Sequence, residues 1–282
     1  MEILRPKFTY RSVGQAAAYL ILIAGSLVIL APLVWMISTS LKEEGVVFIL
    51  PPQIIPSPII WSNYPKALTL IPFNLFFRNS AIVTGLSIIG AVLTASIVAY
   101  SFARLRWWGR DVLFMVVLAT MMLPNQITLI PQFVIFRQLG WLDTFLPLIV
   151  PYWGAGAFFV FLLRQFFMTI PAELDDAALI DGCNHFNIFY RIILPLSKPA
   201  LAAVAIFAFQ WTWNDFLHPL IYINHQEGWT VALALGSFRA LGGTTWSLLM
   251  AAATTTVLPI IVLFFFAQRY FIQGVVFTGV KG

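Results

Sequence analysis

The chain has 282 residues and a net charge of +5; 60% of its residues are hydrophobic and only 10% are charged. A soluble domain carries about 25% charged residues, so a water-soluble fold is excluded and we expect one membrane domain over residues 1–282. The positive charge indicates loops held at an anionic lipid surface, and not a nucleic-acid partner. A single cysteine, Cys183, excludes an intrachain disulfide framework, and the three histidines lack the spacing of metal ligands.

Six stretches are apolar enough and long enough to cross a bilayer, which takes about 20 residues. In chain order they are residues 12–41, 79–102, 112–136, 144–163, 199–223 and 240–268. The first is too long for the core of a cleaved signal peptide, so we expect it to remain as a helix. Pro124 and Pro131 are expected to bend or interrupt the third. The sequence therefore predicts an all-α, polytopic membrane protein with six transmembrane helices.

Lys and Arg residues indicate which ends of these spans face the cytoplasm. If the N-terminus lies inside, the inner segments hold eleven of the 16 basic residues and the outer segments hold five. Both termini are therefore predicted to be cytoplasmic. The segment between the fourth and fifth spans is predicted to be cytoplasmic as well.

That segment begins with the most acidic stretch of the chain, PAELDDAALIDG at residues 171–182. Pro171 suits the first turn of a helix, and the carboxylates that follow it lie near the positive end of the helix dipole. Gly182 is placed to end this helix, and Asn184 can cap the next one. Two short helices at the cytoplasmic surface are therefore predicted.

The first of these helices has the character of a docking element. Ala177 and Ala178 are small enough to let another backbone approach closely, and Asp176 beside them can meet an arginine or lysine of a partner. The alternative is a solvated loop that is acidic for solubility alone, because acidic residues have little influence on membrane orientation.

The order of residues in this segment resembles a known motif. IPAELDDAALIDG at residues 170–182 is followed by FYRIILPLSKP at residues 189–199. This arrangement is similar to the cytoplasmic EAA loop of ABC-transporter permeases, whose usual form is Glu-Ala-Ala, an Asp-Gly three residues later, and then Leu-Pro. Asp176 stands in place of the glutamate, which keeps the charge on a side chain that is one methylene shorter.

Further matches are spread along nearly the whole chain and resemble the carbohydrate permeases of the maltose-transporter kind, which have six spans. They are NY at 63–64, NS at 79–80, LGWLDT at 139–144, FLLRQFF at 161–167, WTWNDF at 211–216 and the ending GVKG at 279–282.

The resemblance implies that the chain is not an enzyme. It implies the transmembrane permease subunit of an ATP-driven importer for a sugar or oligosaccharide, in a bacterial or archaeal inner membrane. The implied partners are a second permease subunit, two copies of a cytoplasmic ABC ATPase, an extracytoplasmic sugar-binding protein and membrane lipid. Because the chain has no GxxxxGK[ST] phosphate loop, ATP and Mg are expected on the ATPase and no cofactor is expected here.

In this family the EAA helix sits in a groove of the ATPase and carries its closure to the membrane helices. The coupling loop would cover residues 167–198. The residues that the resemblance assigns to ATPase coupling are Glu173, Asp176, Ala177, Ala178, Asp181 and Gly182.

Polar and aromatic residues in the predicted fifth span are candidates for a solute path. Asp215 is the only acidic residue within a predicted span, and intramembrane acids usually face a cavity or a partner. Trp211, Trp213 and Asn214 add the aromatic and amide groups with which sugars interact. The alternative is that the tryptophans are interface anchors and that Asp215 pairs within the bundle.

Asn125 and Gln126, which lie between the two prolines of the predicted third span, are the other candidates for lining the path. The alternative is a proline kink whose freed backbone groups are satisfied by neighbouring helices.

A stand-alone secondary transporter or channel is the alternative function. It would need coupling ions with paired membrane charges, or inverted repeats, whereas the predicted spans hold one acid and no repeat pair. A membrane enzyme would need a group of catalytic or metal-binding side chains that the sequence does not bring together. The sequence does not specify which sugar or related solute is carried.

Overall fold

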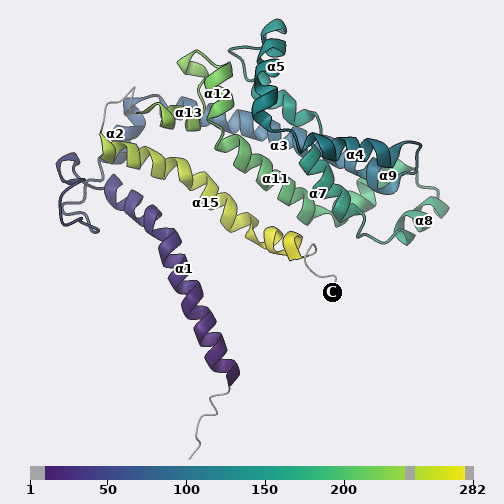
Figure 1. Ribbon diagram of the computed structural model, residues 1–282, viewed down its shortest axis with the longest axis horizontal. Helices are drawn as coiled ribbons and strands as arrows, with labels where there is room; N and C mark the ends of the chain where they lie inside the picture. The colour runs from purple at the N-terminus through teal and green to yellow at the C-terminus, as the bar shows by residue number, and fades with distance from the viewer. Residues whose placement is uncertain (1–9, 239–244, 277–282) are drawn as a thin grey trace, which may run out of the picture. The chain divides into compact units, whose positions relative to one another are not determined.

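Figure 1 shows the computed structural model, which describes residues 10–238 and 245–276. The described residues form helices joined by turns, with no strand among them, so the all-α fold class is confirmed. The ending GVKG lies outside the described residues.

The longer helices are α1 (Tyr10–Ser40), α3 (Phe73–Arg104), α4 (Arg110–Thr120), α5 (Asn125–Gln138), α7 (Ala157–Phe167), α11 (Lys198–Trp213) and α15 (Trp246–Val276). The shorter ones are α2 (Asn63–Leu70), α6 (Leu146–Ile149), α8 (Glu173–Ile180), α9 (His185–Ile188), α10 (Leu194–Leu196), α12 (Leu217–Tyr222) and α13 (Val231–Gly236). Three 3-10 turns, η1 (Glu44–Val46), η2 (Val150–Trp153) and η4 (Gln226–Gly228), and one π turn, η3 (Phe189–Ile193), complete the described elements.

Several segments are long and apolar enough to cross a membrane, so the protein is polytopic. Four of them qualify singly, namely Ala17–Ser40, Phe73–Arg104, Leu146–Phe167 and Trp246–Gln268, of which Leu146–Phe167 comprises α6, η2 and α7. A fifth is obtained if two helices that meet at a 78° bend, His185–Leu196 and Lys198–Trp213, form one span. These four segments correspond to the predicted first, second, fourth and sixth spans.

The predicted third span, residues 112–136, is divided between two helices. α4 ends at Thr120, and α5 begins after Pro124, whose ψ of 132° is extended and not helical. A proline also disfavours helical backbone at the residue before it, so the interruption expected at Pro124 is confirmed. Pro131 lies inside α5 without ending it. The predicted fifth span is divided as well, because α11 ends at Trp213 and α12 follows after a turn.

The chain divides into two compact units, and each is described by itself. One unit is Met1–Ile71 with Arg239–Thr255, and the other is Pro72–Phe238 with Thr256–Gly282.

In the first unit, polar side chains fix the turn that follows α1. The Asn63 amide donates hydrogen bonds to the carbonyls of Ser40 and Lys42 at 2.9 and 2.8 Å. The Glu44 carboxylate accepts from the backbone N–H groups of the first two residues of α15 at 2.7 and 2.9 Å. A carboxylate at this position satisfies free N–H groups and complements the helix dipole, so Glu44 caps α15.

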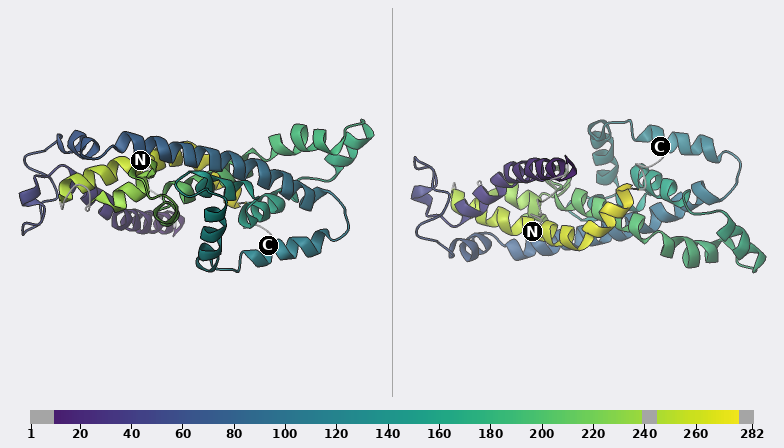
Figure 2. Two further views of the ribbon diagram at one scale, coloured as in Figure 1. Left: turned by 90° about the horizontal axis from the view of Figure 1, so that it is seen from above. Right: turned by 90° about the horizontal axis from the view of Figure 1, so that it is seen from below.

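In the second unit, α3 is the central helix, and Figure 2 shows it running alongside α7 and α11. Ala91, Ala95 and Ala99 recur every four residues on one face of α3 and are fully buried. Small side chains let helices approach closely in a membrane, where packing holds them together. Leu163 of α7 and Val204 of α11 belong to the same buried core, so the alanine face sets how closely these helices pack.

The acidic stretch lies at one end of the second unit. In Figures 1 and 2, α8 projects past the C-terminal end of α3. The chain then returns through α9, η3 and α10 into α11, so the two ends of this segment continue into helices that pack on α3.

Gly90 of α3 faces the side chain of Trp153, and a Cβ at this position would overlap the indole ring. We expect Gly90→Val to lower the free energy of unfolding by about 1–3 kcal/mol, the usual effect of overpacking. The measurement is the midpoint of thermal unfolding of the purified protein in detergent. Gly85→Val is the matched control, since no atom lies within 4 Å of a Cβ built there. Equal midpoints for the two variants would contradict the predicted overlap.

Candidate functional site

The acidic stretch forms a helical hairpin, which consists of α8, the turn at Gly182 and α9. Ala172, and not Pro171, occupies the N-cap of α8. Gly182 has a φ of 81°, a left-handed conformation that glycine adopts without strain. Asn184 caps α9 by accepting a hydrogen bond from the backbone N–H of Asn187 at 2.8 Å. The short helices, the glycine stop and the asparagine cap expected from the sequence are therefore present.

Most residues that the resemblance assigns to ATPase coupling are exposed on this hairpin. The exposed ones are Glu173, Asp176, Ala177, Asp181 and Gly182. Ala178 is buried in the core of the second unit. Apolar side chains are exposed on the same hairpin, Ile180 at 86% and Phe186 at 70%. The free surface of the hairpin is thus both acidic and apolar, a composition that indicates a protein partner.

A buried arginine joins the hairpin to α3. Arg104 is the last residue of α3, and its side chain is only 7% exposed. Its Nη2 donates a hydrogen bond to the carbonyl of Ile170 at 2.7 Å, and its Nε lies 3.6 Å from Asp175 Oδ2. Ile170 lies just before α8 and Asp175 in its first turn, so one side chain fixes both sides of the start of α8. We call these three residues the Arg104 junction.

Asp175 is the carboxylate of α8 that the resemblance does not assign to coupling, and its side chain is 16% exposed. Burial raises the pKa of Asp175, and the positive charge of Arg104 lowers it by a smaller amount. Tyr100, four residues before Arg104 in α3, packs against Phe189 of η3 with ring centroids 5.1 Å apart. The ion pair of the Arg104 junction, which is of low exposure, thus has an aromatic contact between α3 and η3 close to it in the chain.

Contacts with other helices hold the two tryptophans at the end of α11, Trp211 and Trp213, which are candidates for the solute path. Trp213 is 5% exposed, and its Nε1 donates a hydrogen bond to the carbonyl of Thr256 at 3.2 Å. Trp211 is 45% exposed and stacks on Phe159 with ring centroids 5.0 Å apart. Trp213 thus contributes to packing, whereas part of the Trp211 ring remains accessible.

Asp215 pairs with a histidine one helical turn further on. Nδ1 of His218 lies 2.9 Å from Asp215 Oδ2, and the Asp215 side chain is 22% exposed. Asn214 donates a hydrogen bond to the carbonyl of Gln210 at 2.8 Å. Asp215 and His218 are three positions apart, a spacing that lets two side chains meet, so this pair could be predicted from the sequence. A role of these residues in a solute path stays a prediction.

The two remaining path candidates lie at the start of α5. Gln126 is exposed there, and the side chain of Asn125 lies outside the described residues. Across the described part of the chain, no group of three or more His, Cys, Asp or Glu side chains is arranged to hold a metal ion.

A second polar joint connects the turn before α6 with the turn after α12. The Asp143 carboxylate accepts hydrogen bonds from the backbone and side-chain N–H groups of Asn224, the latter at 3.1 Å. Its own backbone N–H donates to the carbonyl of Tyr222 at 2.9 Å. These bonds from Asn224 hold the pKa of Asp143 below its usual value. Asp143 has a φ of 63°, so the joint keeps a non-glycine residue in the left-handed region.

A protein-family model described as "Binding-protein-dependent transport system inner membrane component" matches residues 91–276 of the chain. The chain belongs to this family. The matched range includes the alanine face of α3, the Arg104 junction, the hairpin and α11.

Curated relatives that are similar over most of their length carry related names. The chain is 32% identical to the probable ABC transporter permease protein YurM of Bacillus subtilis, over 96% of the chain and 90% of the relative. It is 32% identical to the sn-glycerol-3-phosphate transport system permease protein UgpE of Yersinia pestis, over 92% and 94%. It is 35% identical to the arabinooligosaccharides transport system permease protein AraQ of Halalkalibacterium halodurans, over 87% and 86%.

A solved structure shares the fold of this chain. It is a chain of a bacterial ABC transporter involved in the import of the acidic polysaccharide alginate, with a TM-score of 0.81 and 22% identity over 95% of this chain and 100% of that one. The protein is therefore the permease subunit of an ABC importer in the inner membrane. Separate subunits of such importers hydrolyse ATP, and transport depends on a binding protein.

In this permease, we expect Asp143→Ala to release the joint with Asn224. At pH 7, hydrogen–deuterium exchange of the Asn224 amide should become about fivefold faster, the effect of losing one ordinary hydrogen bond. Because the pKa of Asp143 is lowered in the folded state, protection in the wild type should be complete above about pH 4 and be lost as the pH falls further. The measurement is exchange followed by mass spectrometry of a peptide that covers residues 222–226.

Asp143→Asn is the control, because it keeps one acceptor oxygen and should lose only part of the protection. Unchanged exchange in Asp143→Ala would contradict the role of this joint.

Proposed function

We propose that this permease imports a sugar, an oligosaccharide or a related phosphorylated or acidic solute by alternating access, driven by a cytoplasmic ATPase that holds the α8–α9 hairpin. The relatives named for sn-glycerol-3-phosphate and arabinooligosaccharides support this solute class. A membrane protein without a phosphate loop depends on partners for its energy, so ATP and Mg would be bound by the ATPase.

The proposed arrangement is one permease domain over residues 1–282 with six spans and both termini in the cytoplasm. In this arrangement α4 and α5 together make the third span, and α11 and α12 together make the fifth. The subunit would pair with a second permease, two ATPase copies and an extracytoplasmic binding protein, in a bacterial or archaeal inner membrane. The excess of Lys and Arg in the inner segments supports this orientation.

The observation that carries the proposal is that the hairpin has two different sides. One side exposes Asp176 and Ile180 together with the other assigned residues. The opposite side is tied to the end of α3 by Arg104, whose side chain is buried. A segment that is free toward the solvent and fixed to a transmembrane helix has the geometry of a lever between a soluble partner and the membrane.

In the proposed mechanism, the ATPase contacts the hairpin differently in its open and closed states. Only a difference of affinity between two states shifts an equilibrium. Movement of α8 would pass through the Arg104 junction to α3, and from α3 to α7 and α11, which pack along it. The stretch Leu194–Trp213, which includes the bend before α11, would follow because it is continuous with the hairpin.

The alternative is a carrier or channel that acts alone. Membership of a binding-protein-dependent family argues against it. Vesicles that contain only the permease subunits separate the two functions, since an autonomous carrier would move solute in the absence of the ATPase.

We expect Arg104→Ala to uncouple ATP hydrolysis from transport. Without the guanidinium, α8 loses its tie to α3, and Asp175 keeps a poorly exposed charge without a partner. Uptake per ATP hydrolysed should fall about 5- to 150-fold, the range of typical coupling free energies. The measurement uses the assembled complex in vesicles, with a binding protein loaded with a sugar selected from a panel of mono- and oligosaccharides.

The charge swap Arg104→Asp with Asp175→Arg should recover part of the coupling, which a loss of folding would not allow. Arg137→Ala is the matched control, because Arg137 also lies in the last turn of a helix but is exposed. Normal coupling in Arg104→Ala would contradict the lever.

We expect a cross-linker placed at Ala177→Cys, in a Cys183→Ser background, to reach an ATPase subunit of the assembled complex. Gly182→Pro should abolish this cross-link and stimulated ATP hydrolysis, because proline cannot adopt a φ of 81°. Gly182→Asn should keep most of both, since asparagine tolerates the left-handed region. A cross-link that never includes an ATPase subunit in the parent, or one that persists in Gly182→Pro with full activity, would refute the proposed contact.

A further inference from the structure

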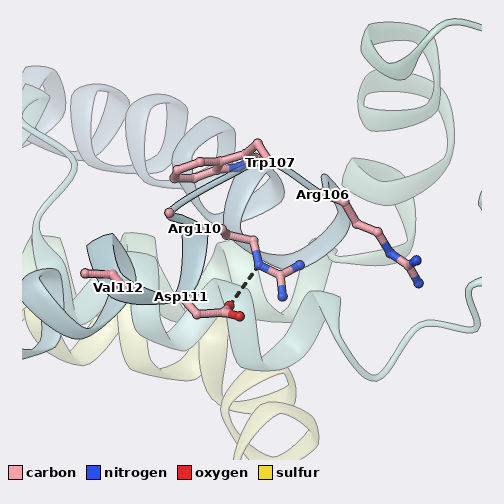
Figure 3. Close-up of a pocket in the computed structure, with 6 residues that line it drawn as sticks. Arg106, Trp107, Arg110, Asp111 and Val112 are labelled. Carbon is pink, nitrogen blue, oxygen red and sulfur yellow. Dashed lines mark hydrogen bonds and ion pairs between the residues drawn. The ribbon is translucent and has the colours of Figure 1, made fainter.

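The loop between α3 and α4 borders an open hollow of about 350 Å³. Figure 3 shows the residues around it: the guanidinium group of Arg110 lies beside Asp111, and the side chain of Arg106 extends away from that pair. The lining residues are Arg106, Trp107, Gly109, Arg110, Asp111 and Val112. The volume falls within the range of about 300–1,000 Å³ that is typical of small-molecule sites.

Both arginines have hydrogen-bond donors available for an anion. Arg106 is exposed and has no hydrogen bond or ion pair with the part of the chain that the structure describes. Arg110 is held in place, because its Nε donates to Asp111 Oδ1 at 2.9 Å and its Nη1 donates to the carbonyl of Leu105 at 3.3 Å. A guanidinium has five N–H donors, so Arg110 keeps three of them free.

The start of α4 adds backbone donors to the same hollow. Gly109 is the N-cap of α4, with a φ of 83° and no side-chain cap. The backbone N–H groups of Asp111 and Val112 precede the first intrahelical bond, which runs from Leu113 to Gly109. Together with the Arg110 guanidinium they offer the donors that a phosphate group requires. Asp111 balances one of the two arginine charges, so the hollow keeps a net charge of about +1.

Two adjacent tryptophans show where this hollow lies relative to a bilayer. Trp108 is 98% exposed and Trp107 is 37% exposed. They follow the membrane-spanning segment Phe73–Arg104 by a few residues. Tryptophan is enriched at the boundary between the hydrocarbon and the headgroups, and an indole that is almost fully exposed in the isolated chain is expected to lie among lipids there.

We infer that this hollow binds the phosphate group of an anionic membrane phospholipid, with Arg110 and the start of α4 on the phosphate and with Arg106 and Trp108 among the neighbouring lipid headgroups. The inference rests on the proposed orientation, which puts the loop at the cytoplasmic leaflet, where anionic lipids attract basic residues. A free phosphate ion shares the same chemistry, but it gives no role to Trp108.

The test uses the assembled importer purified in mild detergent from cells that contain phosphatidylglycerol. The lipid retained per complex is counted by mass spectrometry in the parent and in the double variant Arg106→Ala, Trp108→Ala. We expect about fivefold less phosphatidylglycerol in the variant, the effect of losing one basic contact at a membrane surface, and unchanged phosphatidylethanolamine. Arg106→Lys should keep most of the bound lipid, because the charge remains.

The matched control is the double variant Arg191→Ala, Trp61→Ala, which removes an exposed arginine and a 68% exposed tryptophan elsewhere in the chain. An equal loss in this control, or no loss in the test variant, would overturn the lipid site. Inorganic phosphate is the second arm: if it displaces the lipid at millimolar concentration and binds with the same affinity whether or not Trp108 is present, the site belongs to a soluble phosphate.

The cross-link from Ala177→Cys to the ATPase is read in the same preparations. Lost lipid with an intact cross-link supports the site. If the test variant retains the lipid and the cross-link is intact, the lipid site is refuted and the proposed function is not. If the cross-link is missing in the parent, the proposed function is refuted instead.

Discussion

A buried arginine, Arg104 at the end of α3, connects the α8–α9 hairpin with the helices that pack on α3. Arginine stays charged in any protein environment, so moving Asp175 and the Ile170 carbonyl away would leave a desolvated cation without an acceptor. Breaking a buried pair costs about 3–5 kcal/mol, which is more than a typical coupling free energy of about 1–3 kcal/mol. When α8 is displaced, moving α3 together with it therefore costs less free energy than opening the Arg104 junction.

The packing of α3 explains how such a movement would spread. The alanine face of α3 brings the backbones of α7 and α11 close. Further along the helix, the hydroxyl of Thr212 donates a hydrogen bond to Thr84 Oγ1 at 3.1 Å, buried between α11 and α3. Close-packed interiors have low compressibility and transmit strain. A displaced α3 would therefore carry its neighbours, and the contact between Gly90 and Trp153 would extend the effect to η2.

The sequence predicts features of this structure that are local. Pro124 interrupts a helix and Gly182 ends one through backbone geometry within a few residues, and both were expected. Arg104 and Asp175 are 71 positions apart, and no local pattern links them. Hydropathy likewise measures the length of an apolar run and not its bends, so residues 112–136 count as one span in the sequence but form two helices. The hairpin of the candidate site was thus predictable, and its attachment to α3 was not.

The acidic residues of the chain fall into two groups. Some bond to other residues of the chain, and others are exposed on the hairpin, where a partner could reach them. Glu44 caps α15, Asp143 joins two turns and Asp215 pairs with a histidine, so each is satisfied within the chain. On the hairpin, the carboxylates of three exposed acids have no hydrogen bond or ion pair to described residues, namely those of Glu173, Asp176 and Asp181. In a chain with only 10% charged residues, exposed acids that gather on one side of an anchored hairpin, beside exposed Ile180 and Phe186, are better explained by contacts with another protein than by solubility. A solvated loop would gain nothing from the apolar side chains among them.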